Sequence, residues 1–198
     1  MICGFLWDIS MNNINTNRTL WALGIIAVIV SLAKFKLDGT TEFTFQTIFD
    51  YLSIIVSVWS MITFIFVKFT WKWKIFYKWL VRIPNLNGLW SGKIQSTYQD
   101  GKQIDAELEI VQTLFEVKCI LTTEESRSSS ISCDFILESD TLNDKLSYVY
   151  RNEPSIRNRD GSAIHYGSAV FDIIANELKG CYWTDRKTTG EMMFEKKK

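Results

Sequence analysis

Two apolar stretches before Thr70 limit what this 198-residue chain can fold into. The first covers 20–35, extends to 19–37, and ends in the turn sequence Asp38-Gly39. The second covers 48–69 and carries charge only near its ends. Because a membrane-spanning helix needs about 17–25 apolar residues, the sequence predicts a two-helix transmembrane hairpin. A cleaved signal peptide is the alternative for the first stretch, but no small-x-small cleavage site follows it.

Positive charge is distributed unevenly around these stretches. Lys34 and Lys36 lie between them, whereas five basic residues follow from the end of the second one: Lys68, Lys72, Lys74, Lys78 and Arg82. Loops rich in Lys and Arg stay on the cytoplasmic side of a membrane. The sequence therefore predicts a multi-pass protein of the bacterial inner membrane with both termini in the cytoplasm.

Basic and aromatic residues are interspersed in the segment 68–83, which ends before Pro84. Their spacing and chemistry suit a helix in the headgroup region of a bilayer. We expect the second helix to continue through this segment, where it anchors the chain or, alternatively, transmits motion from the soluble part. Three regions follow: an N-terminal segment at 1–18, a transmembrane hairpin with an interfacial extension at 19–83, and a cytoplasmic ligand-binding domain at 84–198.

From Asn85 onward the apolar residues recur with period two, which is typical of strands. The connectors are mostly short, so neighbouring strands should pair as antiparallel hairpins. We predict an eight-stranded, antiparallel, up-and-down β-barrel after the membrane helices, because closure removes exposed strand edges. A two-sheet sandwich is the competing fold. The expected strands are 89–98, 104–111, 114–123, 130–138, 145–151, 164–175, 177–184 and 189–196.

Alternation gives each expected strand an inner and an outer face. Phe115, Val117 and Cys119 are expected inside, opposite Glu116, and the serine run 126–129 is expected in a connector. The cysteines in this half are interpreted as small apolar strand residues, and no disulfide is expected in a cytosolic domain.

The sequence Gly88-Leu89-Trp90 opens the first expected strand. A GxW motif at this position resembles lipocalin-type barrels, in which the tryptophan closes one end of the barrel. A buried tryptophan beside a turn glycine is the simpler interpretation.

Taken in order, these features resemble the two-transmembrane, β-barrel effectors of bacterial cyclic-oligonucleotide-based anti-phage signalling systems (CBASS). The likeness lies in the two spans, the aromatic and basic junction, and a β-domain that opens with NLNGLWSGKI. It continues in LKGCYWTDRKTTGEMMFEK, where the matching residues are Leu178, Gly180, Tyr182, Thr184, Arg186 and Gly190. The resemblance covers nearly the whole chain.

This resemblance implies a function. The barrel would bind a cyclic dinucleotide made by a partner nucleotidyltransferase. The chain would then oligomerise in the lipid bilayer and disrupt the inner membrane, which kills the infected cell (abortive infection).

A cyclic dinucleotide offers two bases that stack on aromatic rings and two phosphates that bind arginine, hydroxyl or backbone N–H groups. Most candidate residues lie near the ends of the expected strands, and Arg186 continues an inward alternation. Ordinary core tyrosines and a solvated turn arginine are the alternatives. The candidate ligand-binding residues are Trp90, Ser96, Tyr98, Tyr148, Tyr150, Arg151, Tyr182, Thr184 and Arg186.

Several functions are disfavoured. The sequence has no nucleophile elbow, P-loop, spaced carboxylate pair or clustered metal ligands, so we expect neither an enzyme nor a metal site or cofactor. The formal net charge of zero gives no reason to expect DNA or RNA binding. A membrane-anchored, lipocalin-like carrier of an apolar small molecule is the alternative function.

Overall fold

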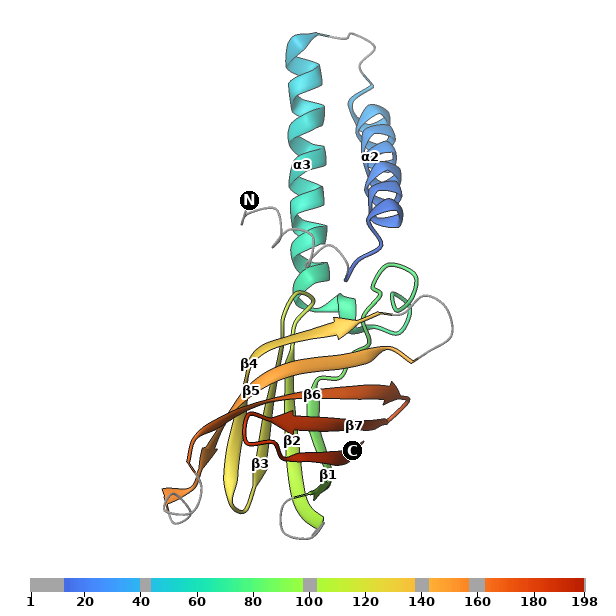
Figure 1. The fold of residues 1–198 in the computed structure, drawn as a ribbon. Coiled ribbons are helices and arrows are strands. Elements are labelled where there is room, and N and C mark those ends of the chain that lie inside the picture. The colour runs from blue at the N-terminus through green and yellow to red at the C-terminus, as the bar shows by residue number, and fades with distance from the viewer. Residues whose placement is uncertain (1–12, 40–43, 98–102, 138–142, 157–162, 198) are drawn as a thin grey trace. The chain divides into compact units, whose positions relative to one another are not determined.

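The structure is a computed structural model that describes residues 13–39, 44–97, 103–137, 143–156 and 163–197 (Figure 1). The chain divides into two compact units, Met1–Pro84 and Asn85–Lys198. The first unit contains long helices, and the second contains the strands of the sheet.

Two long helices make up most of the first unit, α2 (Thr16–Asp38) and α3 (Phe45–Lys68). Each begins at a residue whose side chain accepts a backbone hydrogen bond from the first turn, Asn15 for α2 and Thr44 for α3. Helix α2 ends at Gly39, which adopts the left-handed conformation common at helix C-termini.

Both helices are long and apolar enough to cross a membrane by length and composition. The candidate spans Thr16–Leu37 and Phe45–Lys68 have mean hydropathies of 2.0 and 1.9. At 1.5 Å per residue each extends over about 35 Å, against a hydrocarbon core of about 30 Å. The indole N–H of Trp59 in α3 donates to the backbone carbonyl of Leu23 in α2 (3.2 Å). This hydrogen bond joins the helices within their apolar parts.

Helix α3 ends at Lys68, so the predicted helical extension to residue 83 is wrong. A short 3₁₀ helix, η1 (Thr70–Lys72), follows, and turns follow it. The backbone of 80–82 pairs with that of 13–15 through two hydrogen bonds of 2.9 Å, and Val81 between them is buried. These contacts between distant parts of the chain override the helical spacing of the basic residues.

Eight strands form a closed barrel in the second unit. Each strand pairs antiparallel with the next one, and β8 pairs with β1. The predicted fold, two apolar helices followed by an eight-stranded antiparallel barrel, is therefore confirmed. The strands are β1 (Gly88–Ser96), β2 (Gln103–Gln112), β3 (Val117–Thr123), β4 (Ser126–Ile136), β5 (Lys145–Pro154), β6 (His165–Ile174), β7 (Glu177–Thr184) and β8 (Thr189–Lys196).

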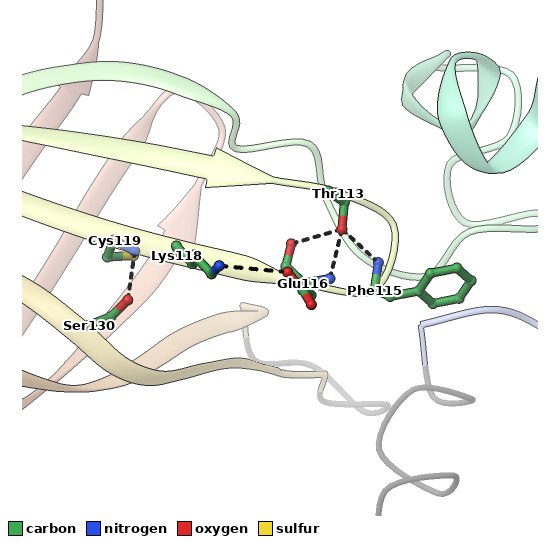
Figure 2. Close-up of polar contacts among 6 residues, drawn as sticks. All are labelled: Thr113, Phe115, Glu116, Lys118, Cys119 and Ser130. Atoms are coloured by element: carbon green, nitrogen blue, oxygen red, sulfur yellow. Dashed lines mark hydrogen bonds and ion pairs between the residues drawn. The ribbon is translucent and has the colours of Figure 1, made fainter.

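The ladder between β3 and β4 is the shortest of the eight. It pairs 120–122 with 127–129, whereas the other neighbouring strands pair over seven to ten positions. Strand β4 then shifts register between Ser130 and Ser132. At this bulge the Ser130 hydroxyl accepts a hydrogen bond from the Cys119 N–H (3.0 Å; Figure 2). A side chain thus replaces a backbone partner where the ladder stops.

The segment 114–116, predicted as the start of a strand, is a tight turn. The Thr113 hydroxyl oxygen accepts hydrogen bonds from the N–H groups of Phe115 (3.3 Å) and Glu116 (2.9 Å), as Figure 2 shows. This turn buries Leu114 completely and leaves Phe115 47 % exposed. The expected inward position of Phe115 is therefore wrong.

The serine run 126–129, predicted as a connector, is the first half of β4. Ser128 faces inward and is 3 % exposed, whereas its neighbour Arg127 is exposed. Both faces of this half-strand are polar, so the alternation that marks a strand is not visible in hydrophobicity.

Apolar residues fill the end of the barrel at which the chain enters β1, here called the Trp90 end. Trp90 is 1 % exposed, and its indole N–H donates to the carbonyl of Leu86 (2.9 Å). The Lys196 ammonium lies 5.3 Å from the centre of the Trp90 ring, and burial lowers the pKa of this lysine. Other fully buried apolar side chains at this end include Leu108, Ile110, Leu114, Leu146, Leu178 and Phe194. The buried Gln112 side chain accepts a hydrogen bond from the Leu86 N–H (2.8 Å).

Candidate functional site

Many of the inward-facing residues at the opposite end of the barrel are polar or aromatic. Here β1, β3, β5 and β7 end, and the strands that follow them begin. We call this the Tyr150 end, and its inward-facing residues include Ser96, Thr123, Ser126, Ser128, Tyr150, Asn152, Tyr182 and Thr184. All of these carry hydroxyl or amide groups without a formal charge, and two are aromatic.

Two tyrosine rings lie against glycines on neighbouring strands. A Cβ atom on Gly167 would come within 2.5 Å of the Tyr150 ring, and one on Gly190 within 2.5 Å of the Tyr182 ring. Any larger residue at either glycine would displace a ring. Gly167 on β6 therefore makes room for the ring of Tyr150 on β5, and Gly190 on β8 makes room for the ring of Tyr182 on β7.

Tyr148 lies two residues further into the barrel than Tyr150 on β5. Its ring packs against Phe171 (centroids 6.0 Å apart) and Tyr150 (5.7 Å). Tyr148 is 2 % exposed, and its hydroxyl has no hydrogen-bond partner among the described residues. Burial raises the pKa of both Tyr148 and Tyr150, so both phenols stay protonated at neutral pH. Tyr148 thus brings an unsatisfied polar group into the interior.

Two free thiols lie beside this part of the interior. The sulfur atoms of Cys119 and Cys133 are 3.6 Å apart and are not bonded to each other. The contact with Cys133 and burial together raise the pKa of the Cys119 thiol, and both cysteines contribute to the raised pKa of Tyr148.

A polar cluster on β4 and β5, formed by Ser126, Ser128 and Asn152, was not among the predicted site residues. The Asn152 amide donates to the hydroxyl oxygens of Ser126 (3.0 Å) and Ser128 (2.8 Å). Asn152 is 8 % exposed. Asn152 was missed because the strand was expected to end at Arg151, one residue too early. Strand β5 continues to Pro154, so Asn152 is a strand residue that faces inward.

The β7–β8 turn places Arg186 at the rim of this end. The hydroxyls of Thr184 and Thr188 are 2.6 Å apart across the turn, and Lys187 between them has a positive φ of 64°. The exposed Arg186 guanidinium donates to the carbonyl of Ala163, just before β6. Arg186 therefore connects the β7–β8 turn to the residues that lead into β6, the strand paired with β7.

The predicted ligand-binding residues divide into groups. Ser96, Tyr148, Tyr150, Tyr182 and Thr184 face the interior, in the half of the barrel that Arg186 borders. Trp90 lies at the opposite end.

Two further predicted residues lie apart from this group. Arg151 is on the outer face of β5, where it forms an ion pair with Glu153 (3.3 Å). Tyr98 lies outside the described residues.

The chemistry of this end is that of binding. Aromatic rings can stack on bases, and neutral hydroxyl and amide groups can form hydrogen bonds to base edges, sugars or phosphate oxygens. Within the described parts of the chain, no three His, Cys, Asp or Glu residues lie close enough together to hold a metal ion.

The barrel matches a family model over residues 81–196, and that family is described as "Cap15, cyclic dinucleotide receptor domain". Relatives named CD-NTase-associated protein 15 cover most of the chain. The protein from Staphylococcus schleiferi is 32 % identical over 153 residues, which are 75 % of this chain and 80 % of the relative. The protein from Escherichia albertii is 31 % identical over 171 residues, which are 81 % and 84 % of the two chains.

A third relative of the same name, from Yersinia aleksiciae, is 32 % identical over 114 residues, which are 56 % of this chain and 54 % of the relative. The family match covers the whole barrel, and the two longer alignments reach into the helical unit as well. A receptor domain binds a messenger and does not transform it. The chain belongs to the Cap15 family of CBASS-associated cyclic dinucleotide receptors.

Proposed function

We propose that this protein is a membrane-anchored anti-phage effector. Its barrel binds a cyclic dinucleotide at the Tyr150 end, and its helices then assemble with those of other copies and disrupt the bacterial inner membrane. The observation that carries the proposal is the segregation of the barrel interior. One end is closed by packed apolar side chains, and the other presents tyrosines, hydroxyls and an amide.

The chemistry of the Tyr150 end suits a cyclic dinucleotide. Base stacking on an aromatic ring contributes about 1–3 kcal/mol per base, and Tyr150 and Tyr182 supply two such rings. The Arg186 guanidinium at the rim, with its planar fork of N–H donors, matches a phosphodiester. The Thr184 hydroxyl lies at the base of the same turn.

The helical unit supports a role in the membrane. It contains the apolar helices α2 (Thr16–Asp38) and α3 (Phe45–Lys68), and the receptor domain follows it from Asn85. Basic residues after α3 favour a cytoplasmic position for the barrel, where a partner CD-NTase would release the messenger. Two helices cannot enclose a sizeable pore, so breach of the bilayer by this chain requires several copies. The small residues Ala22, Gly24 and Ala27 on α2 allow close helix contact.

Thermal unfolding of the full chain in lipid nanodiscs tests the receptor part of the proposal. The chain is heated with cyclic dinucleotides of different bases and, separately, with fatty acids. A ligand at about 100 times its dissociation constant stabilises the folded state by roughly 2.7 kcal/mol, which should raise the barrel midpoint by on the order of 10 °C. A shift with fatty acids and with no nucleotide would replace the receptor with a carrier of apolar molecules.

Dye release from liposomes tests the effector part. Full-length chain in vesicles of bacterial lipids should release the dye only when the messenger is added, and crosslinking should then show multimers. If the chain binds the messenger but neither releases the dye nor forms crosslinked multimers, it is a receptor that acts in some way other than membrane disruption.

A further inference from the structure

Ser126, Ser128 and Asn152 form a cluster of hydrogen-bonded polar side chains inside the Tyr150 end of the barrel. Asn152 is 8 % exposed and Ser128 is 3 % exposed. The side chains come from two paired strands, since Ser126 is opposite Pro154 and Ser128 is opposite Asn152 in the β4–β5 ladder. The bulge after Ser130 changes which β4 residues face inward, so the serines face the interior only before it.

The hydrogen bonds within the cluster leave specific groups available to a ligand. The Asn152 amide nitrogen donates to both serine hydroxyl oxygens, so these contacts use neither serine O–H hydrogen. They also do not use the Asn152 carbonyl oxygen. The Ser126 hydroxyl also lies 3.3 Å from the Thr123 hydroxyl, and either of the two can donate to the other. The cluster therefore presents one fixed acceptor, the Asn152 carbonyl oxygen, beside the hydroxyl donor of Ser128.

This pattern suits a nucleobase edge better than a phosphate. Each base edge offers N–H donors next to oxygen or nitrogen acceptors. The Asn152 carbonyl oxygen would accept from a base N–H, and the Ser128 hydroxyl would donate to the acceptor beside it. A buried phosphate would need a nearby cation. The neighbouring Arg127 is on the outer face of β4, so the inward-facing cluster itself has none.

The cluster also lies beside an aromatic ring. Tyr150 and Asn152 are two residues apart on the same face of β5, which places them about 7 Å apart along the strand. A base that stacks on Tyr150 would therefore present its edge towards Asn152.

We propose that Asn152, oriented by Ser126 and Ser128, hydrogen-bonds the edge of one nucleobase and so determines which cyclic dinucleotide the receptor prefers. This rests on the proposed receptor function. The tyrosines and Arg186 would then bind all cyclic dinucleotides, and the Asn152 cluster would distinguish between their bases.

The test is a binding titration of the full chain in lipid nanodiscs with cyclic di-AMP, cyclic di-GMP, cyclic di-UMP and cyclic GMP–AMP. Asn152→Ala should weaken binding of the preferred ligand by about 10- to 100-fold and should reduce the differences among the four. Ser128→Ala, which removes one of the two anchors of the amide, should give a smaller change in the same direction. Asn143→Ala is the matched control, because Asn143 is exposed and precedes β5 at the Trp90 end.

Two results would overturn the inference while the receptor function stands. In the first, Asn152→Ala and Ser128→Ala keep the wild-type affinities and order of preference. In the second, they weaken all four ligands equally and lower the midpoint of unliganded unfolding, which would make the cluster a structural clamp. A wild-type chain that binds none of the four ligands would remove the receptor function and this inference together.

Discussion

The two ends of the barrel are built on the same eight strands and differ in what their inward-facing side chains do. At the Trp90 end, apolar side chains fill the interior, and the indole of Trp90 satisfies its one polar group on Leu86. At the Tyr150 end, hydroxyls and an amide occupy the equivalent positions, and their hydrogen bonds are made to one another. Apolar contacts of the first kind stabilise the fold, and in the proposed receptor the second kind of group binds the ligand.

Trp90→Ala should show the largest effect on stability. Removing a fully buried aromatic side chain costs about 3–5 kcal/mol, and the Leu86 carbonyl would also lose its donor. Urea unfolding of the full chain in detergent micelles, followed by tryptophan fluorescence and circular dichroism, measures this. Trp90→Phe is the control and should cost less. A loss below about 1 kcal/mol in Trp90→Ala would contradict a stabilising role for the Trp90 end.

Tyr182→Ala should have the opposite profile. Tyr182 is only half-buried, so the free energy of unfolding should change little. Loss of one stacking ring should weaken cyclic dinucleotide binding by about 10- to 100-fold, measured by calorimetric titration. Trp183→Ala is the matched control, since Trp183 is the next residue, faces outward and is 46 % exposed. Equal losses in the two variants would argue against binding inside the barrel.

Alkaline pH should destabilise the barrel through its buried tyrosines. The pKa values of Tyr148 and Tyr150 are raised in the folded state, because burial disfavours the phenolate. Their contribution to the free energy of unfolding is fully present below pH 10, the pKa of an unfolded tyrosine. Above pH 10 the free energy of unfolding falls by about 1.4 kcal/mol per pH unit for each tyrosine that stays protonated in the folded state. Lys196 at the Trp90 end acts in the opposite direction, because burial lowers its pKa.

Urea unfolding at a series of pH values from neutral to alkaline measures this decline. Tyr150→Phe and Tyr148→Phe should each make it shallower. An unchanged slope in both variants would show that the decline comes from groups elsewhere in the chain.

Tyr148→Phe should have the smallest effect, and it should stabilise the unliganded barrel. The substitution removes a buried hydroxyl that has no partner among the described residues, and a buried unsatisfied group is unfavourable by about 1 kcal/mol or more. Urea unfolding at neutral pH measures the gain. A loss of stability would mean that the hydroxyl is satisfied by water, and Tyr148 would then not be an unoccupied donor.

The sequence predicts the fold well where hydrophobicity alternates clearly. The strands expected at 177–184 and 189–196 match β7 and β8. There Leu178, Met192 and Phe194 are buried at inward positions, and the acidic residues lie at the outward positions between them. It fails at 126–129, where both faces are polar, although the residues form an ordered half-strand. It also fails at 68–83. There the backbone pairs with residues 13–15, and this distant contact determines the conformation more than the local spacing of side chains does.

The site is predictable only in part for a related reason. Tyr150 and Tyr182 could be assigned to the interior because they continue apolar alternations. Asn152 could not, because a polar residue at a strand end is indistinguishable in sequence from the start of a loop. Its inward position depends on β5 continuing to Pro154 and on its two serine partners in β4.

The pairing of β1 with β8 has a consequence for synthesis of the protein. Along the chain, α2 and α3 precede every strand, and β8 is made after the other seven. Until β8 pairs with both of its neighbours, the other seven strands can form only an open sheet whose edges are β1 and β7. The apolar helices are therefore made before the barrel can close, and no chain can enclose a ligand before all eight strands are complete.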